Sequence, residues 1–186
     1  MDEGQNLFDL AGVSDNDEDG FIEKNGIPIE LKIVFMGYGS LPEVAQLLQS
    51  QWLELGIRVE LMQVAGFADL LSVIESGDYH LVAFNEFSAE PTILNRYYSA
   101  NGDRNWSGYT GDEVLEQWLT QSTQTLDDTE RAQLYSDIQR RIMEQALILP
   151  IRDYTNVIGV RSNIDGLVFA RQGWWPLLTN LVIDDK

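Results

Sequence analysis

The 186 residues include 30 acids against 12 lysines and arginines, which gives a formal net charge of −18, and 44% of the residues are hydrophobic. A surface this acidic repels the phosphates of nucleic acids and the anionic face of a membrane, so no nucleic-acid partner is expected. The chain has no cysteine and one histidine, His80, which leaves little room for disulfides, metal sites of Cys and His, or a Ser/His/Asp triad. An enzyme is therefore not expected.

The chain opens with a strongly acidic segment. Residues 1–30 contain nine acids and one lysine. Residues 6–10 have the pattern of a helix end, and Gly12 stands where a left-handed residue ends many helices. An acidic loop over 14–20 follows. Between 29 and 35 every second residue is apolar, and this period of two predicts a strand.

The next part of the chain alternates between strand and helix patterns. Apolar residues at helical spacing predict a helix over 44–55, with Pro42 near its start and Gly56 just after its end. A strand over 57–61, a helix over 67–74 that stops at Gly77, and an apolar strand over 81–84 follow. Short connections between alternating strands and helices predict an α/β fold with parallel strands and right-handed crossovers.

The second half of the chain is less regular. Residues 85–111 are polar, aromatic and without a clear period, and a helix is predicted around 114–119. Asp127 and Glu130 form a capping box for another helix. Its inner face is expected to contain Tyr135, Ile138, Ile142 and Met143. Apolar segments at 147–151, 157–160 and 167–169 are predicted to be strands.

The acidic loop resembles the start of an EF-hand calcium loop. Carboxylates occupy its first, third and fifth positions, and Gly20 occupies the sixth, where the chain must turn. Gly26 stands at the twelfth position in place of the usual bidentate Glu, which predicts a modest affinity. The expected ligands of a structural Ca²⁺ are Asp15, Asp17, Asp19, the carbonyl oxygen of Phe21, and Glu23. The alternative is a solvated acidic turn without a cation.

A ligand site is expected after the third predicted strand. Loops that follow the carboxyl ends of parallel strands are where α/β folds bind ligands, and rings with a few polar groups suit peptides or small molecules. The candidate ligand-binding residues are Phe84, Asn85, Glu86, Phe87, Glu90 and Trp106. The alternative is that these rings only pack the loop onto the body. Glu86 and Glu90 are not favoured as a catalytic pair, because the sequence fixes neither their distance nor their environment. His80 is expected to be a surface or hydrogen-bonded residue.

An ordered set of short motifs resembles one family. The motifs include Ser-Gly-Asp-Tyr-His-Leu and Asn-Trp-Ser-Gly-Tyr, and the set covers residues 11–20, 23–28, 53–61, 76–81, 105–109, 131–135, 149–151 and 155–157. In this order they resemble the extracellular solute-binding proteins of family 5, the oligopeptide, dipeptide and nickel receptors of bacterial ABC importers. The resemblance extends over residues 8–170.

The resemblance implies one lobe of a longer receptor that closes two lobes around its ligand. Residues 1–30 would be an acidic N-terminal segment, 31–170 a periplasmic-binding-protein-like α/β lobe with a mixed, partly parallel sheet flanked by helices, and 171–186 a return toward the missing N-terminal lobe. The implied partners are a peptide or other small solute and an ABC permease, and no cofactor is required. The implied location is periplasmic or extracellular, with membrane association through the missing N-terminus.

The sequence leaves a second reading open. No signal peptide precedes the first predicted element, so either the protein is cytosolic or an upstream portion is missing. The cytosolic alternative is an independent acidic α/β interaction module.

One position of the family motif bears on the ligand. Peptide-binding members have an Asp four residues before a Pro, and that Asp pairs with the terminal ammonium of the peptide. Alignment on Pro91 places Phe87 at this position. Two outcomes follow: Glu86 or Glu90 replaces the Asp and the ligand still carries a cation, or Phe84 and Phe87 stack on an uncharged ligand such as an oligosaccharide.

Overall fold

The computed structural model describes residues 2–153, 155, 157–170, 173 and 175–184. The chain divides into two compact units, residues 1–86 and residues 87–186.

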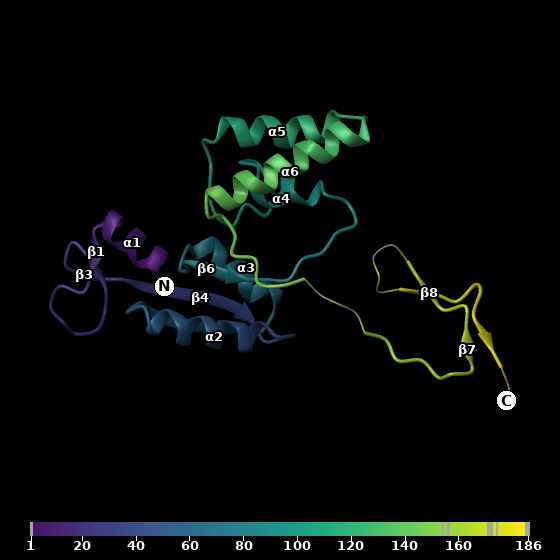
Figure 1. Ribbon diagram of the computed structural model, residues 1–186, viewed down its shortest axis with the longest axis horizontal. Coiled ribbons are helices and arrows are strands. Elements are labelled where there is room, and N and C mark those ends of the chain that lie inside the picture. The colour runs from purple at the N-terminus through teal and green to yellow at the C-terminus, as the bar shows by residue number, and fades with distance from the viewer. Residues whose placement is uncertain (1, 154, 156, 171–172, 174, 185–186) are drawn as a thin grey trace. The chain divides into compact units, whose positions relative to one another are not determined.

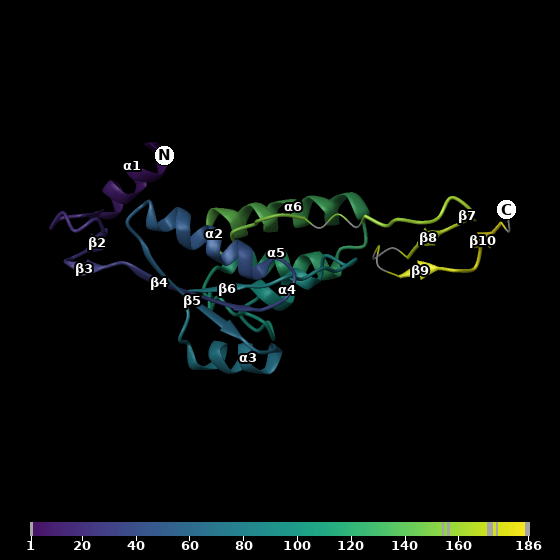
Figure 2. The same ribbon diagram turned by 90° about the horizontal axis from the view of Figure 1, so that it is seen from below.

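The first unit is built around a parallel sheet of three strands. They are β4 (Glu30–Met36), β5 (Arg58–Val64) and β6 (Leu81–Ala83), and their order in the sheet is β5-β4-β6. Ile33 of the central strand β4 lies opposite Leu61 on one side and Leu81 on the other. Helices α2 (Leu41–Leu53) and α3 (Phe67–Ser76) cover opposite faces of this sheet (Figure 2). The predicted α/β alternation is confirmed.

Both faces of the sheet are apolar because a helix covers each of them. On the α2 side, Ile33 and Phe35 of β4 pack with Ala45. On the α3 side, Val34 packs with Leu70, which is fully buried. Successive side chains of a strand point to opposite faces, so a strand covered on both sides must be apolar at every position. This requirement explains the run Ile33–Val34–Phe35.

A small antiparallel sheet of three strands lies near the start of the chain, and the acidic loop connects its first two strands (Figure 1). Helix α1 (Asp2–Ala11) ends at Gly12, whose φ of 68° confirms the predicted left-handed position. Strands β1 (Val13–Ser14), β2 (Glu23–Lys24) and β3 (Ile27–Pro28) follow. Val13 and Ile22 pack with Ile57, which joins this small sheet to the start of β5.

Three helices form the core of the second unit: α4 (Ile93–Tyr98), α5 (Glu113–Gln124) and α6 (Asp128–Glu144). The carboxylate of Asp127 accepts a hydrogen bond from the backbone N–H of Glu130 at 2.8 Å, which confirms the predicted cap of α6. The buried face of α6 comprises Leu134, Tyr135, Ile138 and Ile142. The prediction that Met143 belongs to this face is wrong. Met143 is 49% exposed, because the residue after Ile142 is turned by about 100° around the helix axis.

Among the described residues of the last part of the chain there are four strands of two residues each. β7 (Ile164–Asp165) pairs with β10 (Val182–Ile183), and β8 (Val168–Phe169) pairs with β9 (Pro176–Leu177), both antiparallel. The strand predicted over 167–169 is confirmed in β8. The predictions over 147–151 and 157–160 are wrong: these residues form no strand in the described chain, and most of their apolar side chains are exposed. Across all described residues, no helix has the length and apolarity to cross a membrane.

Candidate functional site

The carboxyl edge of the parallel sheet is the first candidate site. Strands β4 and β5 end at Met36 and Val64, and the chain then enters α2 on one face of the sheet and α3 on the other (Figure 2). Ligands of open α/β sheets bind where neighbouring strands send their connections to opposite faces. Because parallel strands end at the same edge, the loop after β6 that begins with Phe84 lies at this edge too.

Three aromatic residues follow the three strands at this edge. Tyr38 comes after β4 and is 42% exposed, and Phe67 comes after β5 and is 39% exposed. The ring of Phe67 lies 6.1 Å from the ring of Phe84, at an angle of 41°. The structure therefore gives the predicted residue Phe84 an aromatic neighbour. Tyr38 and Phe67 were not predicted, although each lies within three residues of a strand end, which is the signal that could have identified them.

The charge of this edge is negative. Glu43 lies in the first turn of α2, Asp69 in the first turn of α3, and Glu86 comes two residues after Phe84. The loops and helix starts at 37–43, 65–69 and 84–86 contain no lysine or arginine. A concave or loop-lined surface with one sign of charge attracts ligands of the opposite sign. The edge therefore favours a cationic group over an anionic one.

The predicted ligand residues are divided between the two units. Phe84, Asn85 and Glu86 end the first unit, whereas Phe87, Glu90 and Trp106 belong to the second. Phe87 is exposed, and the backbone N–H of Glu90 donates to Ser88 Oγ at 3.0 Å.

Trp106 belongs to a ring cluster in the second unit. Its ring meets that of Tyr97 edge-on at 5.4 Å. Arg104 donates to the Tyr97 hydroxyl at 2.8 Å. The guanidinium also lies near both ring faces, 5.8 Å from the centroid of Tyr97 and 6.0 Å from that of Trp106. A guanidinium over rings gains cation–π attraction, so this cluster holds Trp106 in one orientation.

A buried carboxylate anchors the loop that carries Trp106. Asp112 is 8% exposed; its Oδ1 accepts from the backbone N–H of Leu115 at 3.0 Å and thereby caps α5. Its Oδ2 accepts from Arg141 Nε at 2.8 Å and from the Tyr109 hydroxyl at 3.2 Å. The hydrogen bond from Arg141 lowers the pKa of Asp112 below its ordinary value. Asn105 Nδ2 in turn donates to the Tyr109 carbonyl at 3.0 Å, so the network reaches the residue before Trp106.

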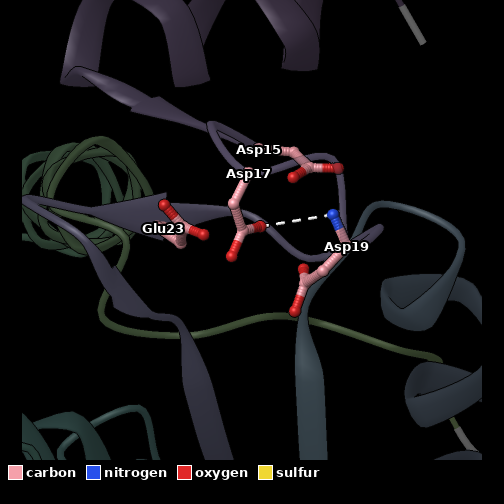
Figure 3. Close-up of side chains that lie close together, drawn as sticks. All are labelled: Asp15, Asp17, Asp19 and Glu23. Atoms are coloured by element: carbon pink, nitrogen blue, oxygen red, sulfur yellow. Dashed lines mark hydrogen bonds between the residues drawn. The ribbon is translucent and has the colours of Figure 1, made fainter.

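The acidic loop between β1 and β2, together with Glu23 at the start of β2, forms an acidic turn that is the candidate metal centre. Ligand oxygens of Asp15, Asp17, Asp19 and Glu23 all lie within 4.8 Å of one another (Figure 3). Backbone N–H groups fold the turn around its carboxylates: Gly20 donates to Asp15 Oδ2 at 2.9 Å, and Asp19 donates to Asp17 Oδ1 at 3.2 Å. Hard oxygen ligands gathered in this way suit Ca²⁺.

The predicted ligands of this centre differ in their surroundings. Glu23 is 6% exposed and accepts from Asn16 Nδ2 at 3.2 Å, whereas the three aspartates are exposed. Arg58 Nη2 lies 3.7 Å from Asp19 Oδ2, and its guanidinium stacks on the Phe21 ring at 3.9 Å. One guanidinium cannot balance four carboxylates, so the donor set fits a divalent cation. The role of the Phe21 carbonyl stays a prediction.

His80 immediately precedes β6, at the end of this strand opposite to the carboxyl edge. Its Nδ1 accepts from the backbone N–H of Lys32 at 2.9 Å, and its own backbone N–H donates to the Lys32 carbonyl at 3.0 Å. His80 is therefore a hydrogen-bonded histidine, as expected.

Solved structures of solute-binding proteins resemble this chain. NikA from Brucella suis, in complex with Fe(III)-EDTA, is 19% identical with a TM-score of 0.80, over 96% of this chain and 37% of that chain. The oligopeptide-binding protein AppA from Bacillus subtilis, in complex with a nonapeptide, is 16% identical with a TM-score of 0.73, over 99% and 37%. A nickel ABC transporter protein from Bacillus halodurans is 24% identical with a TM-score of 0.68, over 78% and 30%.

No protein-family model and no curated protein sequence matches the chain. The chain spans about a third of the length of the solved structures it resembles. At these identities the likeness concerns the fold. The chain therefore has the fold of one part of an ABC-transporter solute-binding protein, the fold that the family 5 resemblance implied.

Proposed function

We propose that this chain is a ligand-binding lobe of an ABC-importer receptor, one that captures a solute, presents it to a permease and catalyses no reaction. The observation that carries the proposal is the match of nearly the whole chain to solute-binding proteins, at TM-scores of 0.73 and 0.80. Such a receptor works outside the cytoplasmic membrane, in the periplasm or extracellular space. A signal peptide or lipoprotein signal upstream in the parent reading frame supports this proposal, whereas a reading frame that starts at Met1 supports the cytosolic interaction module.

The proposed ligand is a peptide or another solute with a cationic group. Among the similar structures, NikA is in complex with a metal chelate and AppA with a nonapeptide. The fold alone therefore does not determine which class of ligand is bound. The carboxyl edge of the sheet combines exposed rings with carboxylates and no lysine or arginine, a surface that favours an ammonium or guanidinium. Glu86 or Glu90 would pair with that cation in the closed receptor.

Replacement of these glutamates tests the ligand proposal in the full-length receptor. Tri-alanine, which has a free ammonium, is the probe, and N-acetylated tri-alanine and cellotriose are the comparison ligands. We expect Glu86→Gln or Glu90→Gln to weaken tri-alanine binding about tenfold or more, because a desolvated ammonium loses its partner. Isothermal titration calorimetry measures this change. The peptide proposal fails if both variants keep tri-alanine affinity while Phe87→Ala abolishes cellotriose binding.

The described C-terminal segment has an apolar surface that we propose the rest of the receptor covers. Its exposed apolar side chains are Ile148, Leu149, Ile151, Val157, Ile158, Val160, Val168, Trp175, Leu177, Leu178, Val182 and Ile183. Exposed apolar side chains in such number, when they gather in one patch, are typical of an interface. The missing N-terminal lobe is the proposed occupant, because about two thirds of a protein such as NikA lies outside the matched part.

The isolated 186-residue chain is therefore expected to bind solutes poorly. A clamp divides its contacts between two lobes, and one lobe alone cannot exclude water from the ligand. Calorimetry with tri-alanine should show no binding in the micromolar range, and the apolar surface should bind a fluorescent hydrophobic dye such as 8-anilinonaphthalene-1-sulfonate. Micromolar affinity of the isolated chain for tri-alanine would show that the site is complete without a second lobe.

We also propose that the acidic turn binds Ca²⁺ in a structural role, separate from the solute. The support is the grouping of four carboxylates within 4.8 Å, with Glu23 buried among them. A cation there would offset the mutual repulsion of these charges and join β1 to β2. The test of this proposal is the melting temperature of the chain in calcium and in chelator.

A further inference from the structure

The sequence contains two Asn-Gly pairs, Asn25-Gly26 and Asn101-Gly102. An asparagine followed by glycine can lose its side-chain amide spontaneously, because the next backbone nitrogen reaches the side-chain carbonyl carbon with no Cβ in its way. Whether this occurs in a folded chain depends on how freely that nitrogen and the asparagine side chain can move. The structure separates the two pairs on this criterion.

Asn25 and Gly26 form the tip of the hairpin between β2 and β3. Their φ angles are 55° and 73°, the positive values that a two-residue type I′ turn requires at both central positions. Both residues are exposed, and nothing lies within 4 Å of the place that a Cβ on Gly26 would take. Within the described chain, the Gly26 N–H and the Asn25 side chain make no hydrogen bond. The attacking and attacked groups are both free.

Asn101 and Gly102 are held in place. The backbone N–H of Gly102 donates to the Ser99 carbonyl at 2.9 Å. A Cβ on Gly102 would collide with the carbonyl oxygens of Asn95 and Arg96, so the backbone here is closely packed. The Asn101 N–H also donates to Ser99 Oγ at 3.4 Å. The nitrogen that would attack is therefore both hydrogen-bonded and confined.

We propose that Asn25 is a site of spontaneous deamidation in the folded protein. The Gly26 nitrogen loses its proton to the solvent and bonds to Asn25 Cγ. The bond between Cγ and Nδ2 then breaks, and Nδ2 leaves as ammonia with a proton from water, which closes a succinimide ring. Water opens the ring at either carbonyl and yields aspartate or isoaspartate. No oxidant, metal or enzyme takes part.

The modification would act on the acidic turn. It adds a negative charge two residues after Glu23, in a segment that is already strongly acidic. Isoaspartate also inserts an extra carbon into the backbone, which changes the spacing and dihedral angles on which a two-residue type I′ turn depends. Each strand of the hairpin has two residues, and Glu23 pairs with Pro28 at its base. An altered turn therefore loosens the strand that carries the buried carboxylate of the candidate metal centre.

The test is to age the whole 186-residue chain at 37 °C and mildly alkaline pH, and to quantify amide loss at each asparagine by peptide mass spectrometry. We expect Asn25 to lose its amide about tenfold or more faster than Asn101, because Asn101 reacts only after local opening. Isoaspartate and aspartate at residue 25 are distinguished by their chromatographic retention. The chain unfolded in guanidinium chloride is the matched control, and there both sites should react at similar rates.

Two results would overturn the proposal. One is a rate at Asn101 equal to or above that at Asn25 in the folded chain. The other is an intact Asn25 after a period in which the unfolded chain has lost most of that amide. The variant Asn25→Gln is a further test. The longer glutamine side chain would have to close a less favourable six-membered ring, so this substitution should abolish the modification at position 25. Neither outcome depends on the receptor function proposed above.

Discussion

Replacing Asp112 by alanine is expected to lower the free energy of unfolding of the second unit by about 3 kcal/mol, which combines a lost helix cap with a lost charged hydrogen bond. The substitution removes the cap of α5 and leaves Arg141 without its carboxylate. Chemical denaturation followed by circular dichroism measures the change. Asp128→Ala is the control, because Asp128 also begins a helix but its side chain is 93% exposed. An equal effect of the two substitutions would contradict the buried role of Asp112.

The same contact makes the second unit sensitive to acid. Because hydrogen bonding to Arg141 lowers the pKa of Asp112, the contribution of this group is complete above the pKa of the unfolded chain, about 4. It is lost as the pH falls through the lower pKa of the folded state. Asp112→Asn should retain much of the cap, because asparagine is also a good N-cap residue. The free energy of unfolding of the Asp112→Asn variant should therefore fall less than that of the wild type as the pH drops below about 4.

Calcium is expected to raise the melting temperature of the first unit by about 10 to 20 °C when its concentration is a hundred times the dissociation constant. Mass action at that ratio gives about 2.7 kcal/mol, and a unit of this size gains several degrees per kcal/mol. The aspartates and Glu23 repel one another until a cation binds, so Asp15→Asn or Asp17→Asn should reduce the shift. Differential scanning calorimetry in millimolar calcium and in chelator measures it.

Ionic strength must be matched in that experiment. The net charge of −18 means that any salt stabilises the chain by screening repulsion, so sodium chloride is the reference condition. Glu75→Gln is the control variant, because Glu75 is an exposed acid of α3 outside the turn. A melting temperature that is the same in calcium and in chelator, at equal ionic strength, would contradict the proposal that the acidic turn binds Ca²⁺.

The parallel sheet was predictable because its pattern is dictated by burial. A central strand covered by helices on both faces has to be apolar throughout, and Ile33, Val34 and Phe35 satisfy this. Helix ends were equally predictable where a single residue has a defined backbone role. Gly77 ends α3 with a φ of 72°, and Asp127 caps α6 with its carboxylate. These signals are local and need no knowledge of the tertiary structure.

Other features depend on tertiary contacts. The apolar residues at 147–151 and 157–160 match a strand pattern, but a strand forms only beside another strand, and the described chain supplies none there. The short helix α4 is held by contacts such as Asn95 Nδ2 to the Leu119 carbonyl at 2.9 Å, which joins it to α5. Six residues show too little period to be recognised as a helix.

The candidate sites divide in the same way. The grouping of Asp15, Asp17, Asp19 and Glu23 was predictable because these carboxylates are close in sequence and a turn keeps them close in space. At the sheet edge the sequence pointed to Phe84, Asn85 and Glu86, which directly follow β6. It did not point to Tyr38 and Phe67, because they reach the same edge only through the parallel arrangement of three strands. The grouping of Asp112 with Arg141 joins residues 29 positions apart and has no local pattern. Partners this far apart in the sequence can be identified only once the fold is known.

The order β5-β4-β6 also affects synthesis of the chain, because the central strand is the first of the three to be made. β4 emerges from the ribosome with both of its hydrogen-bonding edges unpaired. One edge of β4 later pairs with β5 and the other with β6, which ends at Ala83. The sheet around Ile33, Val34 and Phe35 is therefore incomplete until about fifty further residues have been added. During that interval the nascent segment is the part of the first unit most prone to aggregate and most dependent on protection by a chaperone.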